Sequence, residues 1–169
     1  ADIYCGYRYF DSFGTELLYD FGHGLTYGAA ALEAVSVAVD DKDLVVTATV
    51  ANTGETWPVS QVVQVYASHP AEKLPKPKYI LHGFARTQVL DPGERQTVPV
   101  RFPVSELADF SEDASAFLLE AGCYDIRVGF SARSAMLAGS VRLMRDEVVQ
   151  PVLPMDMDRT VNRTPGLAF

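Results

Sequence analysis

The sequence predicts an all-β protein, an antiparallel β-sandwich of about seven strands. Three observations support this prediction. Apolar and polar residues alternate from residue 32 onward, the alternating runs are short, and turn residues rather than helical patterns separate them. The chain has 169 residues, of which 48% are hydrophobic, enough for one domain with a sizeable core.

The first predicted element is a hairpin over residues 32–50, with its turn at residues 40–43. A period of two with one apolar face is typical of a sheet that packs on a core. Residues 61–68 are apolar on both sides, which predicts a central strand, and residues 80–89 predict the next one. The apolar side of the hairpin's second half consists of Leu44, Val46, Ala48 and Val50.

The second half of the chain continues the same pattern. Residues 91–94 are a strong turn signal, and Pro99 in the strand that follows places that strand at a sheet edge. Tyr124 opens a cleanly alternating strand just after a glycine turn, the position of a tyrosine corner. Residues 136–144 supply the last predicted strand.

The two ends of the chain lie outside this pattern. Residues 2–11 are short and aromatic and predict a strand by propensity, with no partner strand in this chain. Because an unpaired apolar strand invites another chain, we expect a homodimer through residues 2–11. A lone strand at the start also suggests truncation. Residues 147–169 are proline-rich and predict an extended tail.

The sequence Phe21-Gly22-His23-Gly24 describes a backbone that bends sharply, since glycine tolerates positive φ. We expect Phe21 and Leu25, which flank the turn, to be buried. We expect His23 to serve the turn rather than to bind a metal or act as a general base. The reason is that no second imidazole or carboxylate is spaced to join it.

Several sequence words along residues 2–143 resemble glycoside hydrolase family 3, the β-glucosidase and β-xylosidase group. The resemblance implies that residues 29–146 are a fibronectin type III-like domain, an immunoglobulin-like sandwich. It also implies that residues 1–28 are the last strand and linker of a preceding α/β sandwich domain. Asp20 stands where the family usually has proline. The words are Tyr7-Arg8-Tyr9-Phe10-Asp11, Phe21-Gly22-His23-Gly24-Leu25-Thr26-Tyr27, Val50-Ala51-Asn52-Thr53-Gly54, Leu81-His82-Gly83-Phe84 and Leu90-Asp91-Pro92-Gly93-Glu94.

The resemblance implies a non-catalytic accessory domain that packs on and stabilises the catalytic domains of a β-glucosidase or β-xylosidase, its expected partners. The family's nucleophile is an aspartate in a Ser-Asp-Trp word, and that word is absent from the sequence. We interpret Asp109 as an exposed loop acid. A complete small hydrolase that uses Asp20, His23 or Asp109 is the weakest alternative, because no activated nucleophile accompanies them.

The second function considered is a carbohydrate-binding or adhesion module. Trp57, beside Pro58, either stacks on a sugar or covers one end of the core, and the large apolar area of tryptophan favours the core. The proline-rich loop at residues 70–78 predicts a stiff, solvated face that reaches toward the catalytic pocket in some relatives. The candidate contact residues are Trp57, Lys73, Lys76, Lys78 and Tyr79.

Charge and motifs exclude other classes. A net charge of −8 argues against nucleic acid or an anionic membrane as the main partner. No apolar run approaches the ~20 residues of a membrane span, and the lack of a signal-peptide pattern favours a cytoplasmic location. The sequence has no phosphate-binding loop, and Cys5 and Cys123 fit free thiols rather than a metal site, so we expect no cofactor.

Overall fold

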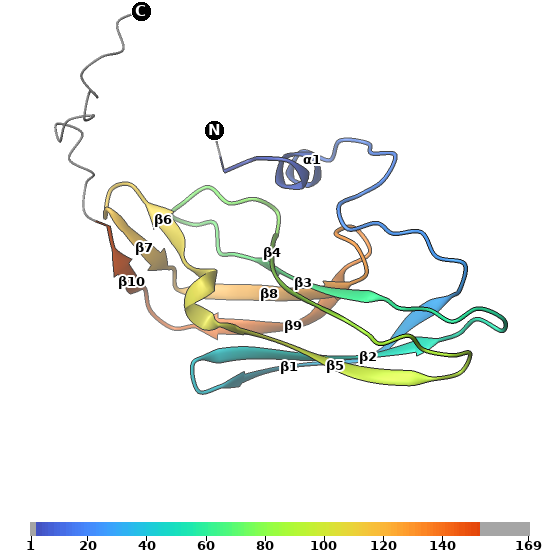
Figure 1. The fold of residues 1–169 in the computed structure, drawn as a ribbon. Coiled ribbons are helices and arrows are strands. Elements are labelled where there is room, and N and C mark those ends of the chain that lie inside the picture. The colour runs from blue at the N-terminus through green and yellow to red at the C-terminus, as the bar shows by residue number, and fades with distance from the viewer. Residues whose placement is uncertain (1–2, 153–169) are drawn as a thin grey trace, which may run out of the picture.

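Two antiparallel sheets face each other in the computed structural model, which describes residues 3–152 (Figure 1). One sheet has the strand order β1-β2-β5 and the other has the order β4-β3-β8-β9. A small third sheet, β10-β7-β6, lies at one end. The elements are α1 Tyr7–Ser12, β1 Ala30–Asp40, β2 Asp43–Asn52, β3 Val62–Ser68, β4 Ile80–Arg86, β5 Arg95–Pro103, the 3₁₀ helix η1 Val104–Leu107, β6 Asp109–Ser111, β7 Ala116–Leu119, β8 Gly122–Gly129, β9 Met136–Leu143 and β10 Glu147–Pro151.

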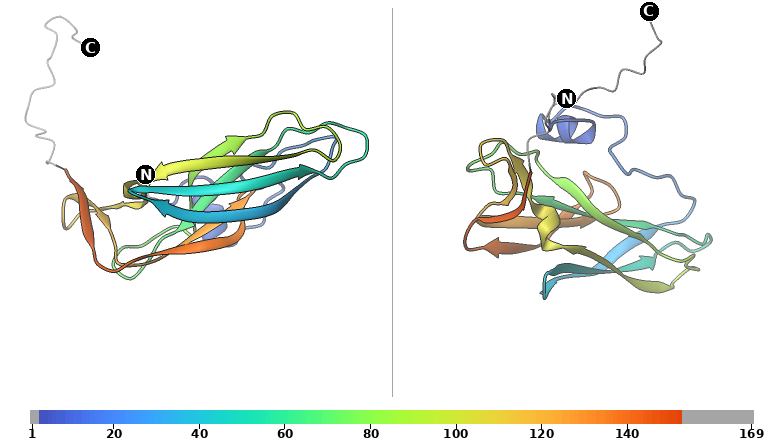
Figure 2. Two further views of the ribbon diagram at one scale, coloured as in Figure 1. Left: turned by 90° about the horizontal axis from the view of Figure 1, so that it is seen from below. Right: turned by 60° about the vertical axis from the view of Figure 1, so that its left-hand side comes forward.

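The core lies between the two large sheets, which Figure 2 shows as stacked layers. Strand β2 contributes four fully buried residues on one face, as its period of two predicts. They pack against β3 and β8, which contribute Val63, Val65 and Ile126. Burying one such side chain stabilises the fold by about 1.5–3 kcal/mol. The seven strands of these sheets confirm the predicted sandwich.

Three individual residues have local conformations or contacts that suit their places in the sandwich. The β1–β2 turn passes through Asp41 at a positive φ of 56°, a conformation that aspartate tolerates better than most residues. Pro99 lies opposite Thr47 on β5, which is the edge strand of its sheet, so the missing N–H faces away from β2. The Tyr124 hydroxyl donates to the Glu120 carbonyl at 3.0 Å, which confirms the tyrosine corner.

The predicted strand at residues 2–11 is wrong, because Tyr7–Ser12 form helix α1. Aromatic residues favour strands where a neighbouring strand is available for pairing, and none of the described strands pairs with this segment. The helix places Tyr7 and Asp11, one turn apart, on the same side. That side faces the β4-β3-β8-β9 sheet, above which α1 lies (Figures 1 and 2).

The prediction of an extended tail over residues 147–169 also needs correction. Glu147–Pro151 form strand β10, which pairs antiparallel with β7 through register pairs such as Glu147–Leu119. The remainder of that predicted tail lies outside the described residues. In residues 3–152, no helix has both the length and the apolar character that a membrane crossing requires.

Candidate functional site

The N-terminal segment, residues 3–28, presents large apolar side chains to solvent. Leu25 and Tyr27 are 88% and 93% exposed and Phe21 is 45% exposed, so the expectation that Phe21 and Leu25 are buried is wrong. Single exposed apolar residues are common, whereas many of them gathered on one segment are typical of an interaction surface. We call this group the apolar face; its members are Ile3, Tyr9, Phe10, Phe13, Leu18, Tyr19, Phe21, Leu25 and Tyr27.

Other side chains of the same segment point toward the sandwich and attach the segment to it, which leaves the apolar face directed to solvent. Tyr7 stacks on Phe21 with ring centroids 4.5 Å apart and meets the buried Tyr66 edge-on at 6.2 Å. Its hydroxyl accepts a hydrogen bond from the Leu81 backbone N–H at 2.8 Å. Helix α1 is therefore attached to strands β3 and β4.

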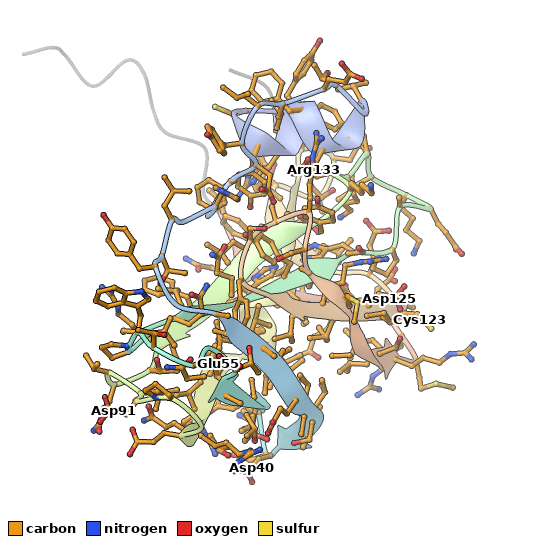
Figure 3. The ribbon with its side chains drawn as sticks, turned by 90° about the vertical axis from the view of Figure 1, so that its right-hand side faces the viewer. Asp40, Glu55, Asp91, Cys123, Asp125 and Arg133 are labelled. Carbon is orange, nitrogen blue, oxygen red and sulfur yellow. The ribbon has the colours of Figure 1, made fainter. Side chains whose placement is uncertain are left out.

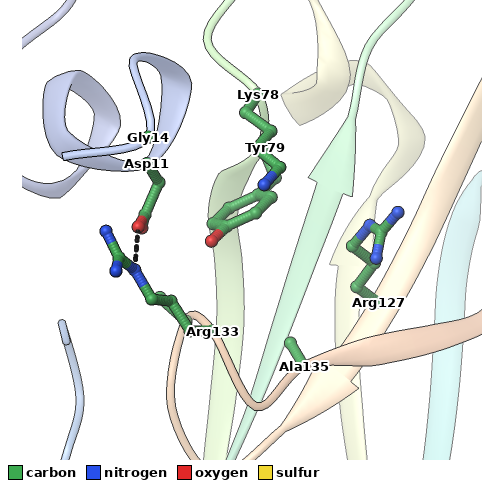
Figure 4. Close-up of a pocket in the computed structure, with 8 residues that line it drawn as sticks. Asp11, Gly14, Lys78, Tyr79, Arg127, Arg133 and Ala135 are labelled. Atoms are coloured by element: carbon green, nitrogen blue, oxygen red, sulfur yellow. Dashed lines mark hydrogen bonds and ion pairs between the residues drawn. The ribbon is translucent and has the colours of Figure 1, made fainter. Parts of the chain in front are cut away.

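Arg133, in the loop between β8 and β9, makes the strongest connection and lies directly beneath α1 (Figure 3). Its Nε donates to Asp11 Oδ1 at 2.7 Å, and its Nη2 donates to the Thr15 carbonyl at 2.6 Å. The Asp11 carboxylate is buried, so this pairing offsets a large desolvation cost (Figure 4). One guanidinium thus holds both α1 and the chain that follows it.

Asp20 provides the next connection, since its Oδ2 accepts the Arg133 backbone N–H at 2.7 Å. Burial opposes ionisation of Asp20, but hydrogen bonds from the Ser131 side chain and the Arg133 backbone lower the pKa of Asp20. His23 Nδ1 lies 3.7 Å from Asp20 Oδ1, on the exposed side of the turn. Both residues lie at the turn, and the role of His23 stays a prediction.

The Phe21-Gly22-His23-Gly24 turn is docked on the sandwich through its backbone. Gly22 has a φ of 79°, and a Cβ there would lie 2.2 Å from Gln64 Oε1. The Gln64 amide cannot easily move away, because its Nε2 donates to the Phe130 and Gly22 carbonyls at 2.6 and 3.2 Å. Glycine is therefore required at this position on two counts.

A second polar cluster lies under residues 70–78 and corrects the prediction of a fully solvated loop. The Lys76 side chain is 3% exposed, and its Nζ lies 2.6 Å from Asp109 Oδ2 and 2.9 Å from Glu120 Oε1. Glu120 is 1% exposed. A buried cation between two carboxylates fixes this loop against β6 and the connection between β7 and β8.

Two histidines complete this buried cluster. His69 Nδ1 lies 2.7 Å from Asp109 Oδ2, and His69 Nε2 lies 2.9 Å from His82 Nε2. One of the two facing nitrogens must donate and the other accept, so both rings cannot carry a full complement of protons. Burial first, and the charge on His69 second, lower the pKa of His82 to about 4.

Asp109 is therefore not the exposed loop acid that the sequence predicted. Burial opposes its ionisation, but His69 and Lys76 hold the pKa of Asp109 below its ordinary value. Its carboxylate accepts hydrogen bonds from both residues, which assigns it to an internal ion pair. Within the described part of the chain, no group of three or more His, Cys, Asp or Glu side chains is arranged so that it could hold a metal ion.

The predicted contact residues separate into exposed and buried sets. Trp57 is 56% exposed rather than covering the core, and its ring lies 6.2 Å from that of Tyr27. Lys73 forms an exposed ion pair with Asp146, and Lys78 is exposed beside the Tyr79 ring. Tyr79 itself is 5% exposed and packs against Tyr66.

Sequence reasoning missed Arg133, His69, His82 and Glu120. The available signal was weak. His69 and His82 follow one predicted strand and open the next, a pattern that places them side by side in a hairpin. Nothing in the sequence indicates that Arg133, in a serine-rich loop, reaches residues 11–20.

The chain is similar in sequence to known proteins whose family agrees with the β-sandwich described above. A family model described as a fibronectin type III-like domain matches residues 61–132. β-Glucosidase A of Butyrivibrio fibrisolvens is 35% identical over 174 residues, covering 89% of this chain and 21% of that protein.

Solved structures agree. The chain superposes on β-glucosidase 3B of Thermotoga neapolitana in complex with glucose, with a TM-score of 0.82, 38% identity, and coverage of 89% of this chain and 21% of that one. The GH3 β-glucosidase of Bifidobacterium adolescentis gives a TM-score of 0.75 and 31% identity, over 93% of this chain and 23% of that one. The chain therefore spans about a fifth of the length of these relatives.

Replacing Lys76 tests whether the buried cluster holds the fold. Lys76→Met removes the cation between Asp109 and Glu120 and leaves two carboxylates without compensation, so we expect the free energy of unfolding to fall by about 3–5 kcal/mol. Lys73→Met, which removes an exposed pair in the same loop, should leave it nearly unchanged. Urea unfolding measures both, and equal effects of the two changes contradict the assignment.

Acid should destabilise the fold between about pH 6.5 and pH 4. The pKa of His82 is lowered in the folded state, so the unfolded chain binds a proton in this window that the folded chain does not. The free energy of unfolding should therefore fall as pH falls, by up to about 3 kcal/mol. Urea unfolding at a series of pH values should show this slope, and His82→Gln should abolish it. His23→Gln, on the exposed turn, should retain it; a slope that persists in His82→Gln contradicts the prediction.

Proposed function

The chain contains a fibronectin type III-like domain of the kind that family 3 β-glucosidases carry, and on this premise we propose that it acts as a non-catalytic accessory domain. In this role it packs on the catalytic domains of the enzyme and stabilises them. The parent activity would be hydrolysis of β-glucosides or β-xylosides. Residues 1–28 would be the end of the preceding domain and its linker, and 29–146 the domain itself.

The observation that carries this proposal is the apolar face. Its side chains are exposed, yet the segment that bears them is fixed by the Asp11–Arg133 pair and by the docked turn. A surface that is apolar and held in one conformation loses little conformational entropy when a partner covers it. Domains that cover such a face would therefore bind through a preformed surface.

The internal use of the acidic residues supports the non-catalytic part of the proposal. A retaining glycosidase requires two carboxylates that face each other across a sugar. Asp11, Asp20 and Asp109 instead accept hydrogen bonds from neighbouring groups of the chain. We also propose that self-association, where it occurs, uses the apolar contacts of residues 2–11 rather than strand exchange.

A binding experiment tests the accessory role. Leu25→Asp with Tyr27→Ser changes two exposed members of the apolar face and should weaken binding to the separately expressed catalytic domains of a family 3 β-glucosidase. The expected loss is at least about tenfold in affinity, or about 1.4 kcal/mol, by calorimetry. Val39→Asp, which adds a charge at a half-exposed position on β1, should bind as the unchanged chain does.

Equal binding by the two variants contradicts the proposed surface. The same preparations provide the catalytic control, because the chain alone should not hydrolyse aryl β-glucosides or β-xylosides. Turnover that survives further purification and is lost in Asp109→Ala contradicts the non-catalytic role.

One observation favours a second function, sugar binding beside Trp57. The exposed Trp57 and Tyr27 rings border a groove of about 510 Å³ that polar groups of Gln61, Ser60 and Arg86 also line. Aromatic faces with a few polar groups are typical of sugar sites. Lys76 and Tyr79, being buried, take no part in this candidate.

Fluorescence tests this second function directly, since Trp57 is the chain's single tryptophan. If the groove binds sugar, cello- or xylo-oligosaccharides at about 1–10 mM should shift the Trp57 emission in a saturable manner. Arg86→Gln should raise the concentration at half-saturation, and Arg101→Gln, a surface arginine on β5, should not. The absence of a response over this range removes sugar binding and leaves the accessory role alone.

A further inference from the structure

A cavity of about 310 Å³ lies between the end of α1, the β8–β9 loop and the start of β4 (Figure 4). It is separate from the apolar face and from the groove beside Trp57. Its charged and polar lining comes from five residues of four different segments: Asp11, Lys78, Tyr79, Arg127 and Arg133. Its volume is at the lower end of the range for small-molecule sites, which is roughly 300–1,000 Å³.

The cavity is positively charged within an acidic chain. Three cationic side chains and one carboxylate line it, whereas the whole sequence has a net charge of −8. Arg133 is paired with Asp11. Among residues 3–152, no carboxylate forms an ion pair with either Arg127 or Lys78, so both cations that line the cavity are free to pair with an anion; Lys78 is exposed and its Nζ lies 5.7 Å from the Tyr79 ring centroid.

One of these cations carries an unsatisfied donor. Arg127 Nε is buried and has no hydrogen-bond partner in the described chain. A buried donor without a partner costs about 1–3 kcal/mol, and an ionised one costs more. Such groups are rare in folded proteins and commonly indicate a missing ligand. A carboxylate offers two acceptors in the planar arrangement that a guanidinium matches.

The opposite wall offers acceptors. Asp11 Oδ1 receives Arg133 Nε, while Oδ2 is buried and has no hydrogen-bond partner among the described residues. An ionised carboxylate can only accept, so a hydroxyl group is the natural partner for Oδ2. Burial first, the Asp11 charge second and a side-chain hydrogen bond with Asp11 third raise the pKa of Tyr79, so its protonated phenol is a donor beside Asp11 with which a ligand hydroxyl would compete.

We propose that this cavity binds a small hydroxylated carboxylate, a sugar acid of about the size of one hexose. Its carboxylate lies against Arg127 and Lys78, and one of its hydroxyl groups donates to Asp11 Oδ2. A neutral sugar leaves the two cations unpaired, and a simple carboxylate leaves Asp11 Oδ2 unpaired. The site therefore selects for both groups in one molecule, independently of the accessory role.

Calorimetry with three probes tests the proposal on the full chain. D-Glucuronate, which has both groups, should bind at least about tenfold more tightly than glucose, which has no charge, or acetate, which has no hydroxyl. Arg127→Gln and Lys78→Gln should each weaken glucuronate binding about tenfold or more. Arg142→Gln removes the same charge from the exposed surface of β9 and should leave binding unchanged.

Lys78 is exposed, so its replacement keeps the test valid if Arg127→Gln fails to fold, which circular dichroism reports. No binding of glucuronate up to about 10 mM overturns the proposal. Equal binding of acetate overturns the role of Asp11, and equal binding of glucose overturns the role of the cations. If Lys78→Gln and Arg142→Gln weaken binding equally, the site is not this cavity.

Discussion

The contact between Arg133 and Asp11 is the interaction on which the outward-facing part of this structure depends. The sandwich has its own apolar core, but residues 3–28 contribute little to that core and are held mainly by polar contacts. Removing Arg133 leaves the buried Asp11 charge without compensation, whereas Arg133 itself is partly exposed. The apolar face and the docked turn lie on the segment that this pair helps to hold, and the positive cavity lies beside it. The ion pair therefore acts with the other hydrogen bonds of the segment to connect the stable domain to the surfaces that we assign to binding.

The sandwich was predictable from sequence because each strand carries its own signal. Leu44 to Val50 alternate with a period of two, Pro99 indicates an edge, and the Tyr124 corner depends on its neighbour four residues upstream. The site was less predictable because its contacts join distant residues. Helix α1 forms where aromatic propensity favours a strand, since packing outweighs propensity when no partner strand exists.

The burial of Lys76 was also not predictable from the sequence. Three lysines among prolines indicate a solvated loop, and the indication fits Lys73 and Lys78. Lys76 differs because the fold brings Asp109, in β6, and Glu120, just after β7, to the same point. Whether a charged residue is buried depends on where its partners lie, and sequence alone does not place them. The loop beneath the helix is consequently rigid at its middle and exposed at its ends.

The connections between the N-terminal segment and the sandwich also determine how the two could separate. Four backbone amides of the sandwich donate to acceptors on the segment, those of Lys78, Leu81, Ala132 and Arg133. Their protection from hydrogen exchange therefore depends on the segment rather than on the sheets. If the segment detaches as one unit, these four amides exchange at a common rate while the β2 and β3 amides remain protected. The exchange rates of these four sandwich amides therefore report how often the N-terminal segment detaches.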